Sequence, residues 1–298
     1  MKNILIIGCG LLGSSLLRII KRKKIAKKIY IYEKSKANIL KIKKLKLPGT
    51  IVNKLQDGVI KSDLIILCTP MSEYKNLILK MNKYLLPKTI VTDIGSSKLE
   101  SSKIIKRFLR KDIFWTSSHP IAGSEVSGPE NGKHNLFENK WCILIKEKKT
   151  NKNHLILLNK FWKKIGSKVA LMTSEKHDKI FSITSHLPHL IAYNLVKSAQ
   201  DFEKKQNYDL IKFSAGGLRD FSRIAASNEI MWRDIFFNNK KNMSKAIDLF
   251  IKNLNSFKKD INSKNNQSIL NKLTKTKKVR SKIIKLKQDI NKPDFGRS

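Results

Sequence analysis

The hydrophobic and polar positions follow different patterns in the two halves of the chain. In the first half, short runs rich in β-branched and aromatic residues alternate with segments of helical periodicity. The β-rich runs are "KNILIIG", "KIYIYE", "DLIILCTP", "TIVTDIGS", "IFWTSSHP" and "WCILIK", and "SKVALMT" follows as the last strand. Runs this apolar suit strands that are buried on both faces. The alternation predicts a parallel sheet with helices on both faces, a doubly wound α/β fold.

Helical periodicity becomes the only pattern in the second half of the chain. In the first half it is found at 14–24, 71–84 and 98–110, and in the second at 177–200, 208–223, 228–255 and a basic tail. We place the boundary near Met172, which predicts a sheet domain over residues 1–172 and an all-helical substrate-binding domain over 173–298. Long apolar helices without an obvious partner favour pairing of two helical domains into a homodimer.

A glycine-rich turn links the first strand to the first helix. "GCGLLG" places Gly8, Gly10 and Gly13 in the G-x-G-x-x-G spacing, directly after the strand at 3–7. Glycines allow a tight turn, and the N–H groups of a helix N-terminus can then approach a pyrophosphate. The context predicts a Rossmann-type dinucleotide site.

The end of the second strand bears on the choice of cofactor. Glu33 lies twenty residues after Gly13, where a carboxylate can bind the ribose 2′-hydroxyl and repel a 2′-phosphate. NAD is therefore expected as the cofactor, and Lys34 and Lys36 lie close enough to leave NADP disfavoured rather than excluded. The expected cofactor-binding residues are Gly8, Gly10, Leu11, Leu12, Gly13, Glu33, Thr69 and Pro70.

Further polar residues follow the ends of predicted strands. Ligands of open parallel sheets bind beyond the carboxyl ends of the strands. Ser96 follows the fourth run, and His119 ends the fifth, so a hydroxyl and an imidazole are expected to meet near the nicotinamide. A histidine at a strand end is more often structural, but its company with Ser96 and the glycine motif favours a catalytic role.

The composition adds a strong positive charge without a nucleic-acid signature. The chain has 62 Lys and Arg against 23 Asp and Glu, a net charge of +39, yet only nine of these residues are arginines. The lysines are spread along the whole chain together with many Ile and Asn, which we interpret as a bias of residue usage. We expect no nucleic-acid partner, although the field should attract anionic small molecules. The last 37 residues hold eleven Lys and Arg and are expected to form a solvated basic helix with a loose end.

The cysteines and apolar runs indicate a reduced, cytoplasmic chain. Cys9, Cys68 and Cys142 are odd in number and lack zinc-type spacing. The apolar run at 4–17 is broken by three glycines, which is unlike a secretion signal. No segment approaches about 18 uninterrupted apolar residues, so no membrane span is expected.

Four blocks occur in a fixed order along the chain: "VTDIGSSK", "SHPIAGSEVSG", "HDKIFSITSHLPH" and "GGLRDFSRIAASNEIMWRDIF". They resemble the successive signature blocks of the prephenate/arogenate dehydrogenases. The final "DINKPDFGR" is similar to the tail of the bacterial cyclohexadienyl dehydrogenases in that group.

The resemblance implies an NAD-dependent step of tyrosine biosynthesis, the oxidative decarboxylation of prephenate to 4-hydroxyphenylpyruvate or of arogenate to tyrosine. The ring carbon that carries the 4-hydroxyl gives its hydride to nicotinamide, and the ring carboxylate leaves as CO₂. His119 suits the acceptor of the hydroxyl proton, and the resemblance also places Ser96 at that hydroxyl. Nothing in the sequence separates prephenate from arogenate.

The resemblance also implies a set of substrate-binding residues. It places His189 near the substrate side chain and makes Arg223 a carboxylate clamp, a role that suits the bidentate guanidinium. Arg219, four residues before Arg223, is a second candidate, and its alternative is a structural ion pair with Asp220. Ser124 and Glu125 are expected beside His119, and a turn or capping pair is their alternative role.

The sequence leaves three other interpretations open, namely a metal site and two other classes of protein. His177, His186 and His189 could form a metal cluster, but "HLPH" is not H-E-x-x-H and no metal is expected; His177 is instead expected to be a structural histidine paired with an acid. One of these classes is another Rossmann dehydrogenase with a helical domain, such as a β-hydroxyacid dehydrogenase or a pyrroline carboxylate reductase. The other is a non-enzymatic basic protein that keeps a nucleotide-binding fold and binds nucleotide or nucleic acid.

Overall fold

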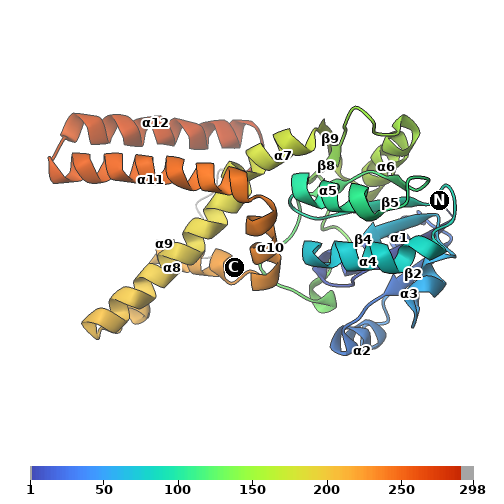
Figure 1. The fold of residues 1–298 in the computed structure, drawn as a ribbon. Helices are drawn as coiled ribbons and strands as arrows, with labels where there is room; N and C mark the ends of the chain where they lie inside the picture. The colour runs from blue at the N-terminus through green and yellow to red at the C-terminus, as the bar shows by residue number, and fades with distance from the viewer. Residues whose placement is uncertain (1, 290–298) are drawn as a thin grey trace.

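The chain folds into a sheet domain followed by a helical part that projects from it (Figure 1). The computed structural model describes residues 2–289 of the 298. The predicted fold class is confirmed, because a parallel sheet flanked by helices is followed by helices alone. The last strand ends at Met172, and the next helix begins at Ser174.

Six parallel strands form the main sheet in the order β3-β2-β1-β4-β5-β6. Their bounds are β1 (Asn3–Ile7), β2 (Lys28–Tyr32), β3 (Thr50–Ile51), β4 (Leu64–Leu67), β5 (Ile90–Asp93) and β6 (Phe114–Trp115). This is the order of dinucleotide-binding sheets, in which the order reverses between β1 and β4 and leaves a crevice for the ligand.

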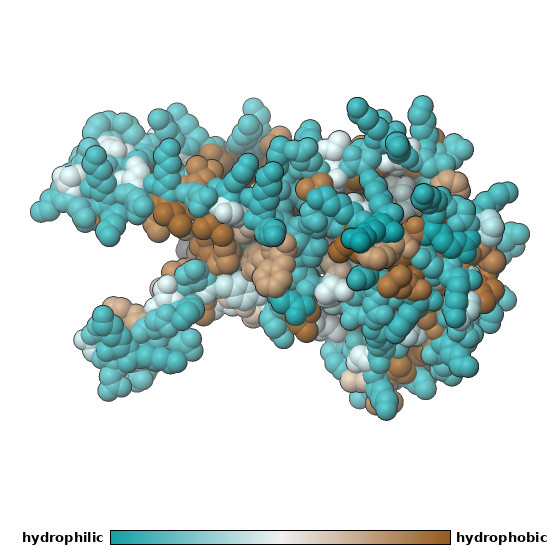
Figure 2. Space-filling model, in the orientation of Figure 1, coloured by the Kyte–Doolittle hydropathy of each residue, from teal (hydrophilic) through white to brown (hydrophobic). Residues whose placement is uncertain are grey.

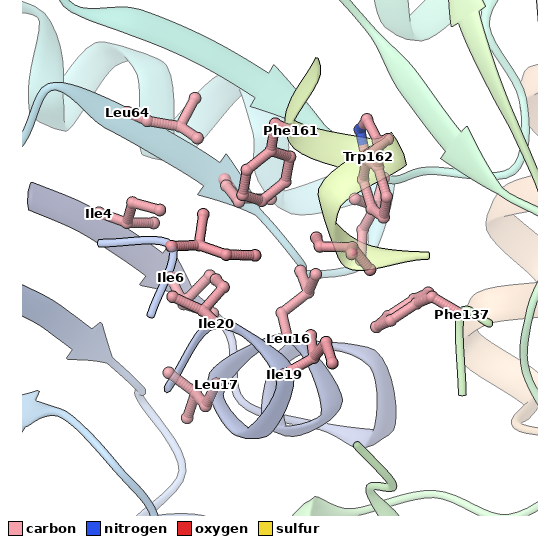
Figure 3. Close-up of a cluster of buried hydrophobic side chains, with 14 of the residues drawn as sticks. Ile4, Ile6, Leu16, Leu17, Ile19, Ile20, Leu64, Phe137, Phe161 and Trp162 are labelled. Atoms are coloured by element: carbon pink, nitrogen blue, oxygen red, sulfur yellow. The ribbon is translucent and has the colours of Figure 1, made fainter. Parts of the chain in front are cut away.

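Helices cover both faces of this sheet. They are α1 (Leu11–Arg22), α2 (Lys36–Lys44), α3 (Leu55–Val59), α4 (Tyr74–Met81) after a 3₁₀ turn η1 (Met71–Glu73), α5 (Leu99–Phe108) and α6 (Lys152–Ile165). Because side chains alternate along β1, Ile4 and Ile6 pack with α1 and α6 in one core, while Leu5 and Ile7 belong to the core on the opposite face. Figure 3 shows the first of these cores, with Trp162 of α6 beside α1. The sheet is thereby packed on both faces, which fixes the positions of the residues at the carboxyl ends of its strands.

We expected the run "IFWTSSHP" to form one strand of the parallel sheet, and this prediction is wrong. It divides into β6 and β7 (Ser118–Pro120), and β7 pairs antiparallel with β8 (Trp141–Ile145), which pairs in parallel with β9 (Lys168–Met172). At the break between β6 and β7, the Ser117 hydroxyl donates a hydrogen bond to the buried carboxylate of Asp93 at 2.5 Å. His119 therefore lies in a second, three-stranded sheet and not at the carboxyl end of a strand of the first.

The helical part differs from the predicted pattern in three places. It contains α7 (Ser174–Phe181), a π-helical turn (Ser182–His186), α8 (Leu187–Gln206), α9 (Gly216–Ala225), α10 (Glu229–Asn238), α11 (Lys240–Asn262) and α12 (Asn266–Lys285). The predicted helix 177–200 is thus interrupted by the π turn, and 228–255 consists of two helices that meet at Asn239. The predicted helix 208–223 begins only at Gly216, after a 3₁₀ turn at Ile211–Phe213. In the basic tail, α12 has no buried residue, and residues 290–298 lie outside the described residues, with most of "DINKPDFGR".

Candidate active site

The glycine turn has the shape that a dinucleotide requires. Gly8 has a φ of +90°, and a Cβ on Gly13 would lie 2.2 Å from the carbonyl oxygen of Gly8, so both positions need glycine. A Cβ on Gly10 would meet no atom within 4 Å, which leaves open space at the start of α1. Leu11 and Leu12 form the first turn of that helix. These residues fit a nucleotide, because the open space lies where free N–H groups of a helix N-terminus can bind phosphate.

Glu33 lies beside this turn and is already held by the backbone. Its Oε2 accepts a hydrogen bond from the N–H of Cys9 at 2.7 Å, and its Oε1 accepts one from the N–H of Ser35 at 2.9 Å. Each carboxylate oxygen keeps a further lone pair, so the group can also accept from a ribose hydroxyl.

Thr69 and Pro70 follow β4 on the other side of β1. The Oγ1 of Thr69 is buried and has no hydrogen-bond partner within residues 2–289. Its Cγ2 would lie 2.8 Å from a Cβ on Gly8, so Thr69 borders the glycine turn. An unused buried hydroxyl at this position suits a ligand that enters the crevice.

His119 belongs to a buried chain of hydrogen-bonding groups that crosses between the domains. Its Nδ1 lies 2.7 Å from Nε2 of His177 on α7, and Nδ1 of His177 lies 2.8 Å from Oδ1 of Asp178. All three side chains are buried. The expectation that His177 has an acid partner agrees with this geometry, but the contact with His119 was not anticipated.

The order of these groups determines which nitrogen of His119 carries the proton. Since the ionised carboxylate of Asp178 only accepts, Nδ1–H of His177 donates to it, and Nε2 of a neutral His177 must accept. His119 then donates through Nδ1–H, and its Nε2 keeps a free lone pair. Burial, together with the nearby positive charge of Lys98, holds the pKa of His119 well below its ordinary value. The imidazole is therefore neutral and can accept a hydrogen bond from a hydroxyl.

A buried ion pair that the sequence analysis missed lies under Ser96 and His119. Lys98 and Asp93 are both fully buried, with Nζ and Oδ2 2.8 Å apart. Lys98 Nζ also donates to the carbonyl of Ser118, next to His119, at 2.6 Å. The pair thus ties the loop that carries Ser96 to the strand that carries His119. "DIGSSK" contains both residues, but one lysine among 53 gives no signal of burial.

Two aspartates of the helical part cap helices of the sheet domain. Asp178 accepts hydrogen bonds from the backbone N–H groups of Lys98 and Leu99, at the start of α5, both at 2.8 Å. Asp234 of α10 accepts from the N–H of Ser72 in η1 at 2.9 Å. Both caps lie at the carboxyl edge of the sheet, so they fix the helical part directly over the crevice.

The π turn and α8 bring two more histidines to this region. His186 is buried next to the backbone of Ser96, with its Nδ1 3.2 Å from Nδ2 of Asn239, and burial lowers its pKa to about 4. His189 stacks on Trp232 at 3.9 Å between ring centroids. His186 of the helical part thus lies beside Ser96 of the sheet domain.

Arg223 on α9 faces the loop that follows His119. Its Nη1 lies 3.3 Å from Oε1 of Glu125, and both side chains are about one-third exposed. The Nε of Arg223 is buried without a partner in the described part of the chain, so a fork of donors remains for a carboxylate. Ser124 and Arg219 are exposed, and the structure does not bring either of them into these contacts. No ion pair joins Arg219 to Asp220 among residues 2–289.

Two family models cover most of the chain. The model described as "Prephenate dehydrogenase, nucleotide-binding domain" matches residues 16–171, and "Prephenate dehydrogenase, dimerization domain" matches residues 173–275. Within residues 2–289, no helix is long and apolar enough to cross a membrane.

Characterised proteins give the same picture over the full length. The chain is 33% identical over 279 residues to the cyclohexadienyl dehydrogenase of Zymomonas mobilis, which covers 94% of this chain and 95% of that protein. It is 31% identical to the prephenate dehydrogenase of Bacillus subtilis, over 86% of this chain and 69% of that one. The crystal structure of Aquifex aeolicus prephenate dehydrogenase with hydroxyphenyl propionate and NAD⁺ matches with a TM-score of 0.88 and 35% identity, over 95% of this chain and 98% of that one.

Proposed function

Since this chain belongs to the prephenate dehydrogenase family, we propose that it catalyses the NAD-dependent oxidative decarboxylation of prephenate, of arogenate, or of both. The products are 4-hydroxyphenylpyruvate from prephenate and tyrosine from arogenate. The two substrates share a ring hydroxyl and two carboxylates and differ in a keto or amino group on the side chain. The observation that carries the proposal is the buried His119–His177–Asp178 chain, because it leaves Nε2 of His119 as an acceptor.

The cofactor site is formed by the glycine turn, Glu33 and the segment after β4. Gly10 leaves room for the pyrophosphate at the start of α1, and Glu33 accepts from the adenosine ribose. Thr69 lines the nicotinamide side with its unused hydroxyl. When bound, NAD⁺ supplies the hydride acceptor of the reaction.

His119 takes up the proton of the substrate hydroxyl as the C–O bond becomes carbonyl-like. Its Nε2 accepts a hydrogen bond that strengthens during the reaction, an effect of general-base type. Ser96 binds the same hydroxyl and is held in place by the Asp93–Lys98 ion pair two residues away. His177 and Asp178 act through His119, by orienting its ring and stabilising the charge it gains.

Arg223 holds a substrate carboxylate through its guanidinium, and His189 lies at the side chain of the substrate. Glu125 pairs with Arg223 in the structure, so the substrate carboxylate competes with Glu125 for the same donors. Ser124 and Arg219 stay candidates for contacts at the rim, where both are exposed.

At the scale of the chain, we propose a nucleotide-binding domain over residues 1–172 and a substrate-binding domain over 173–298 that pairs with a second copy. The family model of the second half is that of a dimerisation domain. The three cysteines are free, which suits a reducing cytoplasm. No nucleic-acid or membrane partner forms part of the proposal.

The decisive test is NADH production by the purified full chain with prephenate and with arogenate at matched concentrations. Turnover of either substrate, with release of CO₂, supports the proposal. A chain that binds NAD⁺ but produces no NADH from either substrate would overturn it.

A further inference from the structure

A lysine that could bind a 2′-phosphate is paired with a glutamate on the opposite side of the nucleotide crevice. Lys34 directly follows Glu33, beyond β2, whereas Glu73 lies in η1, beyond β4. Lys34 Nζ and Glu73 Oε2 are 2.5 Å apart. Because β2 and β4 are the two neighbours of β1, the ion pair crosses the carboxyl end of β1 beside the glycine turn.

The position of Lys34 matters because NADP differs from NAD by a phosphate on the adenosine ribose. Sites that accept NADP place a cationic side chain just after the second strand, which is where Lys34 lies. An ammonium group offers three hydrogen-bond donors and a full charge, and the Lys34 side chain is 47% exposed, so it is free to move. Released from Glu73, it would reach a 2′-phosphate next to Glu33.

The net charge of the chain works against selection of NAD. At +39, the protein attracts the more anionic NADP more strongly than NAD. This long-range attraction must be opposed by local negative charge at the ribose. Glu33 supplies one carboxylate there. Glu73 supplies a second one, which also neutralises the ammonium group of Lys34.

We propose that Glu73 is a specificity-determining residue of the cofactor site: by binding Lys34, it denies a 2′-phosphate its counter-charge and so favours NAD over NADP. The proposal rests on the proposed function only in that the site binds a nicotinamide dinucleotide. Exposed ion pairs are weak and are screened by salt, so the effect is local, moderate and sensitive to ionic strength.

The test is calorimetric titration of the full chain with NAD⁺ and with NADP⁺, without substrate. In E73Q, the Kd for NADP⁺ should fall about tenfold, in the range of one charge-assisted hydrogen bond, and the Kd for NAD⁺ should change less than about twofold. Added salt should remove most of this gain. The matched control is E100Q, which breaks the exposed Lys103–Glu100 pair on α5 with the same change in charge and should leave both constants unchanged.

The double variant K34A/E73Q separates the lysine from the glutamate. If the released Lys34 binds the phosphate, most of the gain seen in E73Q should be lost in the double variant. The inference is overturned if E73Q binds NADP⁺ no more tightly than the native chain, if E100Q shows the same gain, or if the gain persists without Lys34. These outcomes are independent of turnover, so absence of dehydrogenase activity would count against the proposed function and not against this inference.

Discussion

His119 and His177 face each other with ring nitrogens 2.7 Å apart, although 58 positions separate them in the sequence. A histidine without such a partner could present either tautomer to a substrate. Here the carboxylate of Asp178, itself held by two backbone N–H groups, removes that freedom. At the scale of single residues, the site is thus defined by orientation as much as by residue type.

Replacing His119 with Asn should lower kcat by roughly 10²–10⁴-fold with little change in KM, because a positioned acid–base group contributes about this much. His177→Gln should give a smaller loss of kcat, since it leaves the base in place but no longer fixes its tautomer. Steady-state kinetics measures both. His154→Gln, on α6, is the control and should keep native turnover. Full activity in His119→Asn would remove this residue from the chemistry.

Replacing Arg223 with Ala should raise KM strongly, with a smaller change in kcat, because the carboxylate it holds is bound alike in ground and transition states. Truncating one partner of a charge pair that is buried in a complex costs roughly 2–5 kcal/mol of binding, and a loss near the lower end is expected because Arg223 is about one-third exposed without substrate. Arg223→Lys should recover only part, since a point charge does not reproduce the guanidinium fork. The affinity for NAD⁺ should hardly move. A KM defect that vanishes at low salt would instead assign Arg223 to the general basic surface.

At the scale of elements, the domains are joined by helix caps as well as by apolar contact. Trp232 and Ile235 of α10 pack into the core on one face of the sheet. Beside them, Asp234 caps η1, which leads into α4. Burial raises the pKa of Asp234, but hydrogen bonds from Ser72 and Arg233 outweigh burial and leave the pKa below its ordinary value.

Replacing Asp234 with Ala should lower the free energy of unfolding by about 0.5–2 kcal/mol, the usual cost of a lost cap. Asp234→Asn should cost clearly less, since an amide oxygen can still accept from the N–H of Ser72. Denaturant unfolding of both variants measures this difference. Ser35→Ala is the control, because it removes a helix cap at α2 that makes no contact between the domains. Equal stability of the Ala and Asn variants would show that the cap contributes nothing.

The elements that were predicted correctly carry a strong local signal, and those that were missed do not. The continuous apolar runs of β1, β2, β4 and β5 identify buried strands, whereas β3 has only two residues. The break at Asn239 is tertiary, because the Asn239 amide donates to the carbonyl of Asp178. The glycine turn, Thr69 and Ser96 follow from local motifs, whereas His119 lies within β7 of the second sheet, which the local pattern does not indicate. The contact of His119 with His177 depends on how the domains pack, which no local pattern contains.

At the scale of the whole molecule, stability should depend on pH through buried neutral histidines. Burial lowers the pKa of His186 to about 4 and also depresses those of His119 and His177. Below the unfolded pKa of about 6.5, the unfolded chain binds protons that the folded chain does not. The free energy of unfolding should therefore fall as the pH drops from about 6.5 toward 4, by up to about 1.4 kcal/mol per pH unit for His186. Denaturant titrations at pH 7 and pH 5 measure this, and equal stability at both values would contradict it.

The projecting helices should pair with a second copy of the chain. Large apolar side chains are exposed on the helical part, including Phe213 and Leu254, and Figure 2 shows hydrophobic surface on α11 where it faces the gap toward α8. Sedimentation at micromolar concentration should give a dimer, and Phe213→Glu should weaken it. Leu40→Glu, at another exposed apolar position, on α2, should leave the dimer unchanged. A native monomer at micromolar concentration would contradict the proposed pairing.

The hydrogen-bonded chain from His119 to Asp178 also limits how such enzymes can be recombined. His119, the proposed proton acceptor, lies in the first half of the chain, and His177 and Asp178, which hold its ring, lie in the second. A chimera that joins the sheet domain of one relative to the helical domain of another could bind both ligands and still present the wrong ring nitrogen. Shuffling at the proposed boundary near Met172 should therefore preserve turnover only where the parents agree at positions 119, 177 and 178.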